Sequence, residues 1–253
     1  MRCMSILFVF VLLVSACGKK GALIYPDMLV PAAPTNLIVG QFGPSMKVAF
    51  KLPDKDKAGQ DLKDLAGVKI LRRETISGQD EDCSSCANDY RLFKALFIDH
   101  VDASARRYGS LFILLDSDVN VGREYAYKII AFTKSNVDGE ATKPVLAALL
   151  PAPAPPVLHV VSEPTEIKLE FVGLPPQEGV LAGYNLYRWV KGDSLPFLAL
   201  NKGPLVSNNF IDTGLERGAI YVYAVRMVVR LPKGELLESG LSNEVEAGLS
   251  DAE

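Results

Sequence analysis

The sequence predicts an all-β protein in which two similar sandwich domains follow a cleaved leader peptide. The prediction depends on three strand-like blocks that occur twice in the same order, and on a proline-rich segment between the copies. The chain has 253 residues, 49% of them hydrophobic and 23% charged, which suits two globular domains of about 100 residues each. Its net charge is −3 and its basic residues are scattered, so nucleic acid is not an expected partner.

Residues 1–16 have the composition of a secretory leader. Arg2 gives a short positive start, residues 6–14 form an apolar run, and the small residues Ser15 and Ala16 precede Cys17. The run is shorter than the roughly 20 apolar residues that a membrane-spanning helix needs, which makes a permanent span the weaker interpretation. We therefore expect the mature chain to begin near Cys17.

The tetrapeptide at residues 14–17, Val-Ser-Ala-Cys, resembles the lipobox of bacterial lipoproteins. The resemblance implies that Cys17 carries a covalent lipid and becomes the mature N-terminus. An ordinary leader followed by an incidental cysteine is the alternative. Gly18 stands where an inner-membrane retention signal would have aspartate, which favours the outer membrane, on its periplasmic or surface face.

Residues 17–30 are predicted to be a tether between the lipid and the first domain. Within them, residues 17–26 resemble the mature start of small lipoproteins that associate with the lipopolysaccharide export translocon. The alternative is a plain Gly/Lys tether whose lysines contact anionic head groups.

The internal repeat defines a first domain at residues 31–150 and a second at 157–248. Alternating apolar residues in each block predict strands. The paired blocks are residues 46–53 with 167–175, 65–73 with 181–189, and 122–129 with 218–225.

Residues 151–156, Pro-Ala-Pro-Ala-Pro-Pro, are predicted to be the linker between the domains. Proline fixes its backbone torsion and lacks an N–H donor, so no strand is expected here. Six residues of polyproline II would hold the sandwiches roughly 19 Å apart as a semi-rigid spacer.

These blocks resemble fibronectin type III domains, which implies tandem immunoglobulin-like β-sandwiches. Tyr125 and Tyr221 match the family's tyrosine corner, in which the hydroxyl bonds back to the main chain. Phe50 and Phe171 stand where members of the family often have tryptophan. A sandwich of another immunoglobulin-like topology remains the alternative.

The first copy contains an insert between the block with Gly67 and the block with Tyr125. Gly67 and Tyr125 are 58 positions apart, against 38 for Gly183 and Tyr221. The insert includes a polar, acidic stretch with Cys83 and Cys86, for which a local disulfide is the first expectation in an exported protein.

Three other roles for this cysteine pair are less well supported. The acidic residues around it oppose the lowered thiol pKa that a redox pair needs. A zinc site lacks a second ligand pair and has only His100 and His159 to draw on, and haem attachment lacks the histidine that must follow the second cysteine.

The remaining candidates for chemistry are few. Asp116 and Asp118 are conceivable calcium ligands, although a turn before a strand is the simpler interpretation. No nucleophile motif, phosphate loop or metal cluster stands out, so no enzyme activity and no cofactor beyond the lipid are expected.

The sequence thus favours a lipid-anchored interaction module of the cell envelope. Its expected partner is another envelope protein or a polysaccharide. The alternatives are a thiol-disulfide or metal-handling factor acting through Cys83 and Cys86, and an accessory factor of an outer-membrane translocon.

Overall fold

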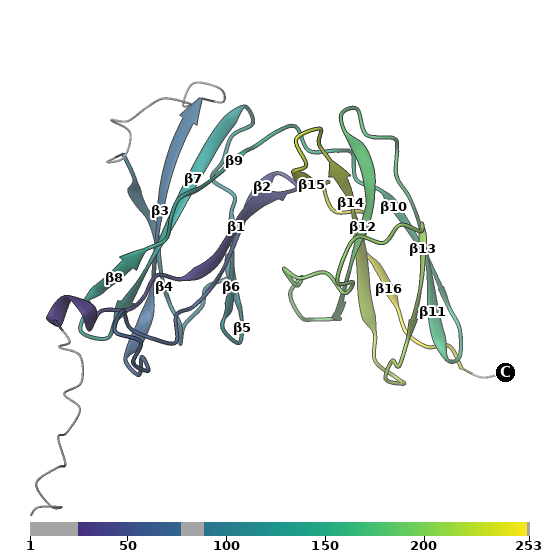
Figure 1. Ribbon diagram of the computed structural model, residues 1–253. Helices are drawn as coiled ribbons and strands as arrows, with labels where there is room; N and C mark the ends of the chain where they lie inside the picture. Colours follow the sequence, from purple (N-terminus) through teal and green to yellow (C-terminus); the bar gives the residue numbers. More distant parts are fainter. Residues whose placement is uncertain (1–24, 77–88, 252–253) are drawn as a thin grey trace, which may run out of the picture.

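The computed structural model describes residues 25–76 and 89–251, and these form two β-sandwiches (Figure 1). A single short 3-10 helix, η1 (Pro26–Met28), precedes the strands. In the described residues, no helix has the length and apolar character needed to cross a membrane. The predicted all-β fold class is confirmed.

The first sandwich pairs a sheet of order β1-β2-β6-β5 with one of order β4-β3-β7, in which β8 and β9 both pair with the free edge of β7. The strands are β1 (Thr35–Phe42), β2 (Ser45–Lys51), β3 (Leu65–Ile76), β4 (Arg91–Phe97), β5 (Ala105–Tyr108), β6 (Leu111–Asp116), β7 (Arg123–Thr133), β8 (Asp138–Ala141) and β9 (Val145–Ala148).

The second sandwich repeats this plan with fewer strands. A sheet of order β10-β11-β13 faces one in which β14 pairs with β12 on one side and with β15 and β16 on the other. The strands are β10 (Val157–Ser162), β11 (Glu166–Val172), β12 (Val180–Val190), β13 (Asn209–Thr213), β14 (Tyr221–Arg230), β15 (Leu236–Glu238) and β16 (Val245–Ala247).

Each sandwich has its own apolar core, built from alternating residues of its strands. In β11 the side chains of Ile167, Leu169 and Phe171 are buried, while the intervening residues are exposed, as expected for a strand with one face on a core. Phe50 of β2 is fully buried at the equivalent place in the first core. The phenylalanines therefore fill the interior positions that the repeat assigned to them.

The repeated Leu-Ala-Gly block has the same backbone role in both copies. The pairing with the neighbouring strand shifts by one residue just before Gly67 in β3 and just before Gly183 in β12, which is the pattern of a β-bulge. A Cβ at either glycine would collide with a backbone carbonyl oxygen, that of Leu96 or of Leu205. Glycine is therefore required at both positions because another chain segment crosses directly against the bulge.

The two sandwiches are in direct contact, so the predicted spacer of roughly 19 Å is wrong. β1 pairs in parallel with β15, with Gln41 opposite Leu237 and Phe42 opposite Glu238, so one sheet runs from β12 through to β5. Residues 151–156 form no strand, and Pro155 lies against Gly240. The linker does not hold the domains apart. Pairing the strand edges of the two domains and burying the apolar side chains beside them is more favourable than leaving both exposed to water.

Candidate functional site

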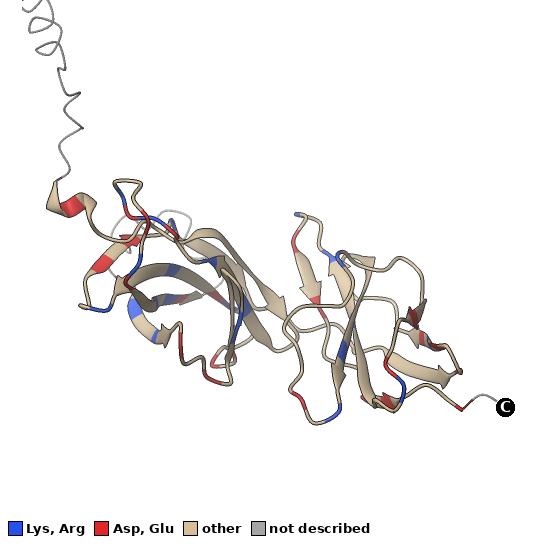
Figure 2. Cartoon of the chain, turned by 90° about the horizontal axis from the view of Figure 1, so that it is seen from below, with Lys and Arg blue, Asp and Glu red and all other residues tan. Residues whose placement is uncertain are grey.

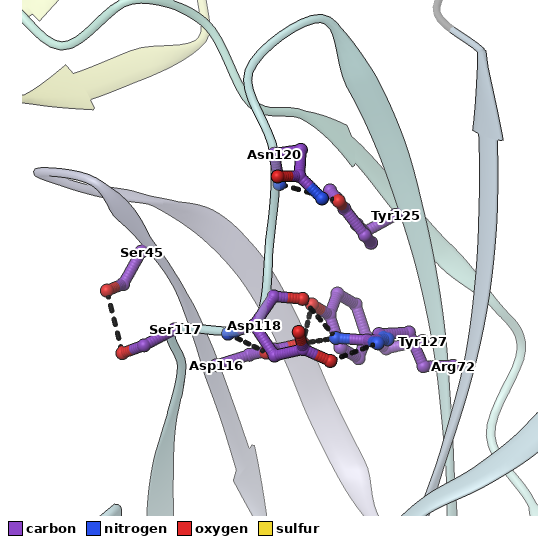
Figure 3. A network of polar contacts seen from close by, with 8 residues as sticks. All are labelled: Ser45, Arg72, Asp116, Ser117, Asp118, Asn120, Tyr125 and Tyr127. Carbon is purple, nitrogen blue, oxygen red and sulfur yellow. Dashed lines mark hydrogen bonds and ion pairs between the residues drawn. The ribbon is translucent and has the colours of Figure 1, made fainter.

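Both tyrosines assigned to tyrosine corners bond back to the main chain five residues upstream. The Tyr125 hydroxyl accepts a hydrogen bond from the N–H of Asn120 at 2.8 Å (Figure 3). The Tyr221 hydroxyl accepts one from the N–H of Glu216 at 3.1 Å. Each bond ties the loop before the strand to the strand itself, which is a structural role.

Asp116 is the centre of a polar network in the first sandwich. Its Oδ2 accepts hydrogen bonds from Arg72 Nη1 at 2.8 Å and from the Tyr127 hydroxyl at 2.7 Å (Figure 3). Its Oδ1 accepts the N–H of Asp118 at 3.0 Å, and Asp118 Oδ2 accepts Arg72 Nη2 at 2.9 Å. The Asp116 side chain is completely buried, whereas that of Asp118 is 81% exposed.

The second sandwich contains the same network. Arg188 Nη1 donates to Asp212 Oδ1 at 2.8 Å, and the Tyr223 hydroxyl donates to Asp212 Oδ2 at 2.8 Å. Asp212 precedes its tyrosine by 11 residues, as Asp116 precedes Tyr127. This repeated pairing was missed in the sequence, although aligning the two copies on Tyr125 and Tyr221 brings the aspartates into register.

These networks fix their charged and hydroxyl groups in internal hydrogen bonds and stabilise the fold. Burial, reinforced by the neighbouring carboxylates, raises the pKa of the Tyr127 and Tyr223 hydroxyls well above the ordinary value, so both stay protonated and act as donors. Burial alone would lower the pKa of Arg72, but the bonds to the two aspartates outweigh it and raise that pKa. Asp116 ends β6, and its bond to the Asp118 N–H begins the turn that the sequence predicted before β7; what the sequence did not indicate is that the same carboxylate pairs internally with Arg72 and Tyr127.

Where the two sandwiches meet, a turn of the first domain packs against the second domain. Arg226 lies over the Phe42 ring, with its guanidinium carbon 3.9 Å from the ring centroid, and its Nη1 donates to the carbonyl of Ser239 at 2.6 Å. The N–H of Gly43 donates to the carbonyl of Glu238 at 3.0 Å. Gly43 has a φ of +61°, and a Cβ there would meet Arg226, so the turn needs glycine.

A partly buried ion pair crosses the same joint. Glu238 of β15 accepts hydrogen bonds from Lys47 Nζ at 3.2 Å and from the Tyr187 hydroxyl at 2.7 Å. Burial and the Glu238 carboxylate raise the pKa of Tyr187, whereas burial lowers the pKa of Arg226. The Lys47–Glu238 pair is thus the charged contact that joins the two domains here.

A second contact lies farther along the interface. Phe197, in the segment between β12 and β13, is buried under the guanidinium of Arg106, whose carbon is 4.8 Å from the ring centroid. The N–H of Phe197 donates to the Tyr108 hydroxyl at 3.2 Å. Two separated contacts oppose both twisting and hinging, so the domains are held in one orientation.

Between these two contacts the interface opens into a cleft of about 620 Å³. Three apolar side chains on its wall remain substantially exposed: Ile38 (65%), Leu198 (41%) and Leu236 (44%). Lys47 and Glu238 also line it, so their ion pair lies at the cleft wall. A cleft at a domain interface, mostly apolar with a few fixed polar groups, is the usual form of a ligand site.

The amide side chain of Asn201 shapes one wall of this cleft. Asn201 Oδ1 accepts the N–H of Leu186, and its Nδ2 donates to the carbonyls of Tyr184 and Gly203. These bonds fasten the segment that carries Phe197 and Leu198 to the edge of β12. The hydrogen bonds that hold this wall therefore lie within the second domain and do not require a ligand.

Several residues singled out in the sequence lie outside the described residues: Cys17, Cys83 and Cys86. His100 and His159 are described, and both are exposed. Within residues 25–76 and 89–251, no group of three or more His, Cys, Asp or Glu side chains could hold a metal ion. Basic and acidic side chains are interspersed over both domains (Figure 2), with no single-sign stripe along the described chain.

Comparison with known proteins finds distant structural similarity. No family model and no curated protein matches the chain. Among solved structures, the FN1–FN3 domains of chicken CNTN1 are 13% identical, with 87% of this chain and 68% of that chain covered and a TM-score of 0.34. A myokine structure is 17% identical over 40% of this chain and 100% of that chain, with a TM-score of 0.31.

The two domains are fibronectin type III-like sandwiches. The strand orders carry this assignment, because in each copy the first two strands share a sheet with the strand that holds the buried aspartate (β1-β2-β6 and β10-β11-β13). In the other sheet the third strand pairs with the long strand that holds the tyrosine corner (β3-β7 and β12-β14). The fold by itself does not specify an activity.

Proposed function

We propose that this chain is a lipid-anchored, non-catalytic binding module of the bacterial cell envelope, whose partner occupies the interdomain cleft. Cys17 carries the lipid, and the two sandwiches form one rigid platform beyond it. The partner is an envelope protein or a polysaccharide.

The observation that carries the proposal is the exposure of Ile38, Leu198 and Leu236 around one fixed cleft. Exposed apolar side chains gathered on a concave surface mark interaction sites more often than single exposed residues do. Because contacts hold the domains at two places, the cleft is preformed, and binding a partner does not cost the conformational entropy of ordering it.

The start of the first domain supports a short connection to a membrane. The carbonyls of Met28 and Val30 accept the N–H groups of Ala58 and Lys57, so the chain is part of the folded domain from residue 28 onward. Met28 lies eleven positions after Cys17, and a fully extended chain of that length reaches at most about 40 Å. A lipid on Cys17 would therefore keep the platform close to the bilayer.

A crosslinking pull-down from detergent-solubilised envelopes tests the proposal. Tagged wild-type protein is compared with Cys17→Ser, which cannot be lipidated, and with Ile38→Asp, which places a charge in the cleft. Val161→Asp is the matched control, because Val161 is similarly exposed (56%) but lies on β10, outside the cleft.

We expect one defined partner to be recovered with wild type and with Val161→Asp, at least tenfold less with Ile38→Asp, and less with Cys17→Ser. Equal recovery with all four proteins would show that neither the anchor nor the cleft is involved. Membrane fractionation of the same samples tests the anchor separately, since Cys17→Ser should move to the soluble fraction.

A further inference from the structure

The two copies of the repeat differ at one sheet edge. In the first sandwich β5 pairs with the outer edge of β6. The equivalent strand of the second sandwich is β13, since Asp116 and Asp212 occupy the same place in the two networks. In the described chain β13 pairs only with β11, on the side of the second sandwich remote from the first (Figure 1). Within the described residues, its other edge has no strand partner; there the Asn209 carbonyl accepts a hydrogen bond from the Ser207 hydroxyl at 2.9 Å.

The main-chain groups at this edge can be assigned from the pairing. The N–H of Phe171 donates to the carbonyl of Asn208 at 2.9 Å, so alternate residues from Asn208 onward bond to β11. The N–H and C=O groups of Ile211 and Thr213 then point outward. In the first sandwich, Leu115 is equivalent to Ile211, and its N–H donates to the carbonyl of Ser104 at 2.8 Å.

The edge lacks three of the features that usually prevent strand pairing, namely lysine, proline and a bulge. β13 has the sequence Asn-Phe-Ile-Asp-Thr, and its only charged side chain is Asp212, which is buried against Arg188 and Tyr223. Two apolar side chains stand exposed beside it, Ile211 at 54% and Val206 at 90%. Such an edge is open to another strand.

The edge is also complementary to itself. In an antiparallel pair centred on Ile211, the outward main-chain groups of two copies face each other, with Ile211 opposite Ile211 and Asn209 opposite Thr213. The outward-facing side chains are uncharged, so no like charges meet, and the two isoleucines join their apolar surfaces. Closed two-fold contacts of this kind are the commonest form of self-association.

We propose that β13 pairs with β13 of a second copy of this chain, joining two β10-β11-β13 sheets into one six-stranded sheet. The inference does not depend on the lipid anchor or on the cleft. It leaves the cleft open, because β13 contributes no residue to its lining.

Disulfide trapping in intact membranes tests this pairing. In the proposed dimer the two Ile211 Cα atoms are about 5.5 Å apart, within the range that a disulfide bridges. Val161→Cys is the matched control, since Val161 is similarly exposed on the same face of the sheet. The two Val161 positions would be five strand spacings apart, about 24 Å. Wild type, treated with the same oxidant, accounts for the native cysteines.

We expect Ile211→Cys to give a reducible dimer at least tenfold above both controls. No excess over Val161→Cys would overturn the proposal, as would an adduct of Ile211→Cys to a different protein, which would assign the edge to a heterologous strand.

Sedimentation of the detergent-purified full chain gives an independent readout. Wild type should sediment as a dimer at micromolar concentration, and Ile211→Lys as a monomer with an unchanged circular dichroism spectrum. A monomeric wild type up to 100 times that concentration would contradict the pairing. If Ile211→Cys fails to fold, the trapping uses Asn209→Cys combined with Thr213→Cys.

Discussion

Removal of the buried carboxylate of Asp116 should destabilise the first sandwich strongly. In Asp116→Ala, the Tyr127 hydroxyl loses its acceptor, and Arg72 keeps only Asp118 as a charged partner in the network. A buried hydroxyl without a partner costs about 1–3 kcal/mol, and breaking a buried ion pair from one side costs about 3–5 kcal/mol. We expect a total loss of about 3–5 kcal/mol, because part of the Arg72 side chain still reaches solvent.

Asp118→Ala is the matched control for this prediction. Asp118 bonds to the same guanidinium at a similar distance, but its side chain is 81% exposed. An exposed pair is worth about 0–1 kcal/mol, so Asp118→Ala should lower the free energy of unfolding by less than about 1 kcal/mol. The contrast therefore compares a buried carboxylate that accepts three hydrogen bonds with an exposed one that accepts a single bond from the same arginine.

Urea unfolding followed by circular dichroism measures both variants. Tryptophan fluorescence run in parallel reports the second sandwich, because the only tryptophan, Trp189, lies in β12. For Asp116→Ala, the urea midpoint measured by circular dichroism should fall below the midpoint measured by tryptophan fluorescence. Equal losses for Asp116→Ala and Asp118→Ala, or a loss below about 1 kcal/mol for both, would refute the assignment of Asp116 as the centre of the network.

Three further predictions concern packing, pH and the domain interface. Gly67→Ala should cost at least about 2 kcal/mol, because its Cβ would collide with the Leu96 carbonyl, whereas Gly40→Ala, with open space around it, should be nearly neutral in the same urea assay. Stability should be fully present below pH 10 and fall above it, because burial and adjacent carboxylates keep the folded-state pKa of three tyrosines above the unfolded value near 10. Each should contribute a slope of about 1.4 kcal/mol per pH unit in alkaline unfolding curves, and a flat profile to pH 11.5 would contradict their assignment as buried donors. The three are Tyr127, Tyr187 and Tyr223. Phe197→Ala should free the domains to move, which small-angle X-ray scattering would detect as a larger radius of gyration; an unchanged curve would show that the β1–β15 joint alone fixes their orientation.

Most of the fold could be predicted because the sequence repeats itself. Alternation around Phe50 and Phe171 gives the strands, and the two Leu-Ala-Gly blocks mark equivalent bulges. The Asp116 network was missed because a carboxylate at a strand end looks like a turn residue until its arginine and tyrosine partners are brought beside it. In the sequence, only the alignment of the two copies, which matches Asp116 with Asp212, indicated that the aspartate has a shared structural role.

The interdomain cleft could not be predicted in the same way. It depends on the parallel pairing of two short strand ends, Gln41–Phe42 with Leu237–Glu238, and on Phe197 in a segment without strand character. Nothing local in the sequence distinguishes these residues from ordinary surface positions. The proline-rich composition of residues 151–156 indicated separation, whereas the contacts on either side decide the arrangement.

Photo-crosslinking from inside the cleft tests the proposed function most directly. A photoreactive amino acid replaces Leu198 on the cleft wall, or Val161 on the remote face of the second sandwich, in the otherwise native chain. The account predicts one defined adduct, to an envelope protein or a polysaccharide, from position 198 and none of the same mass from position 161. No adduct at position 198, with a partner captured at position 161, would contradict it.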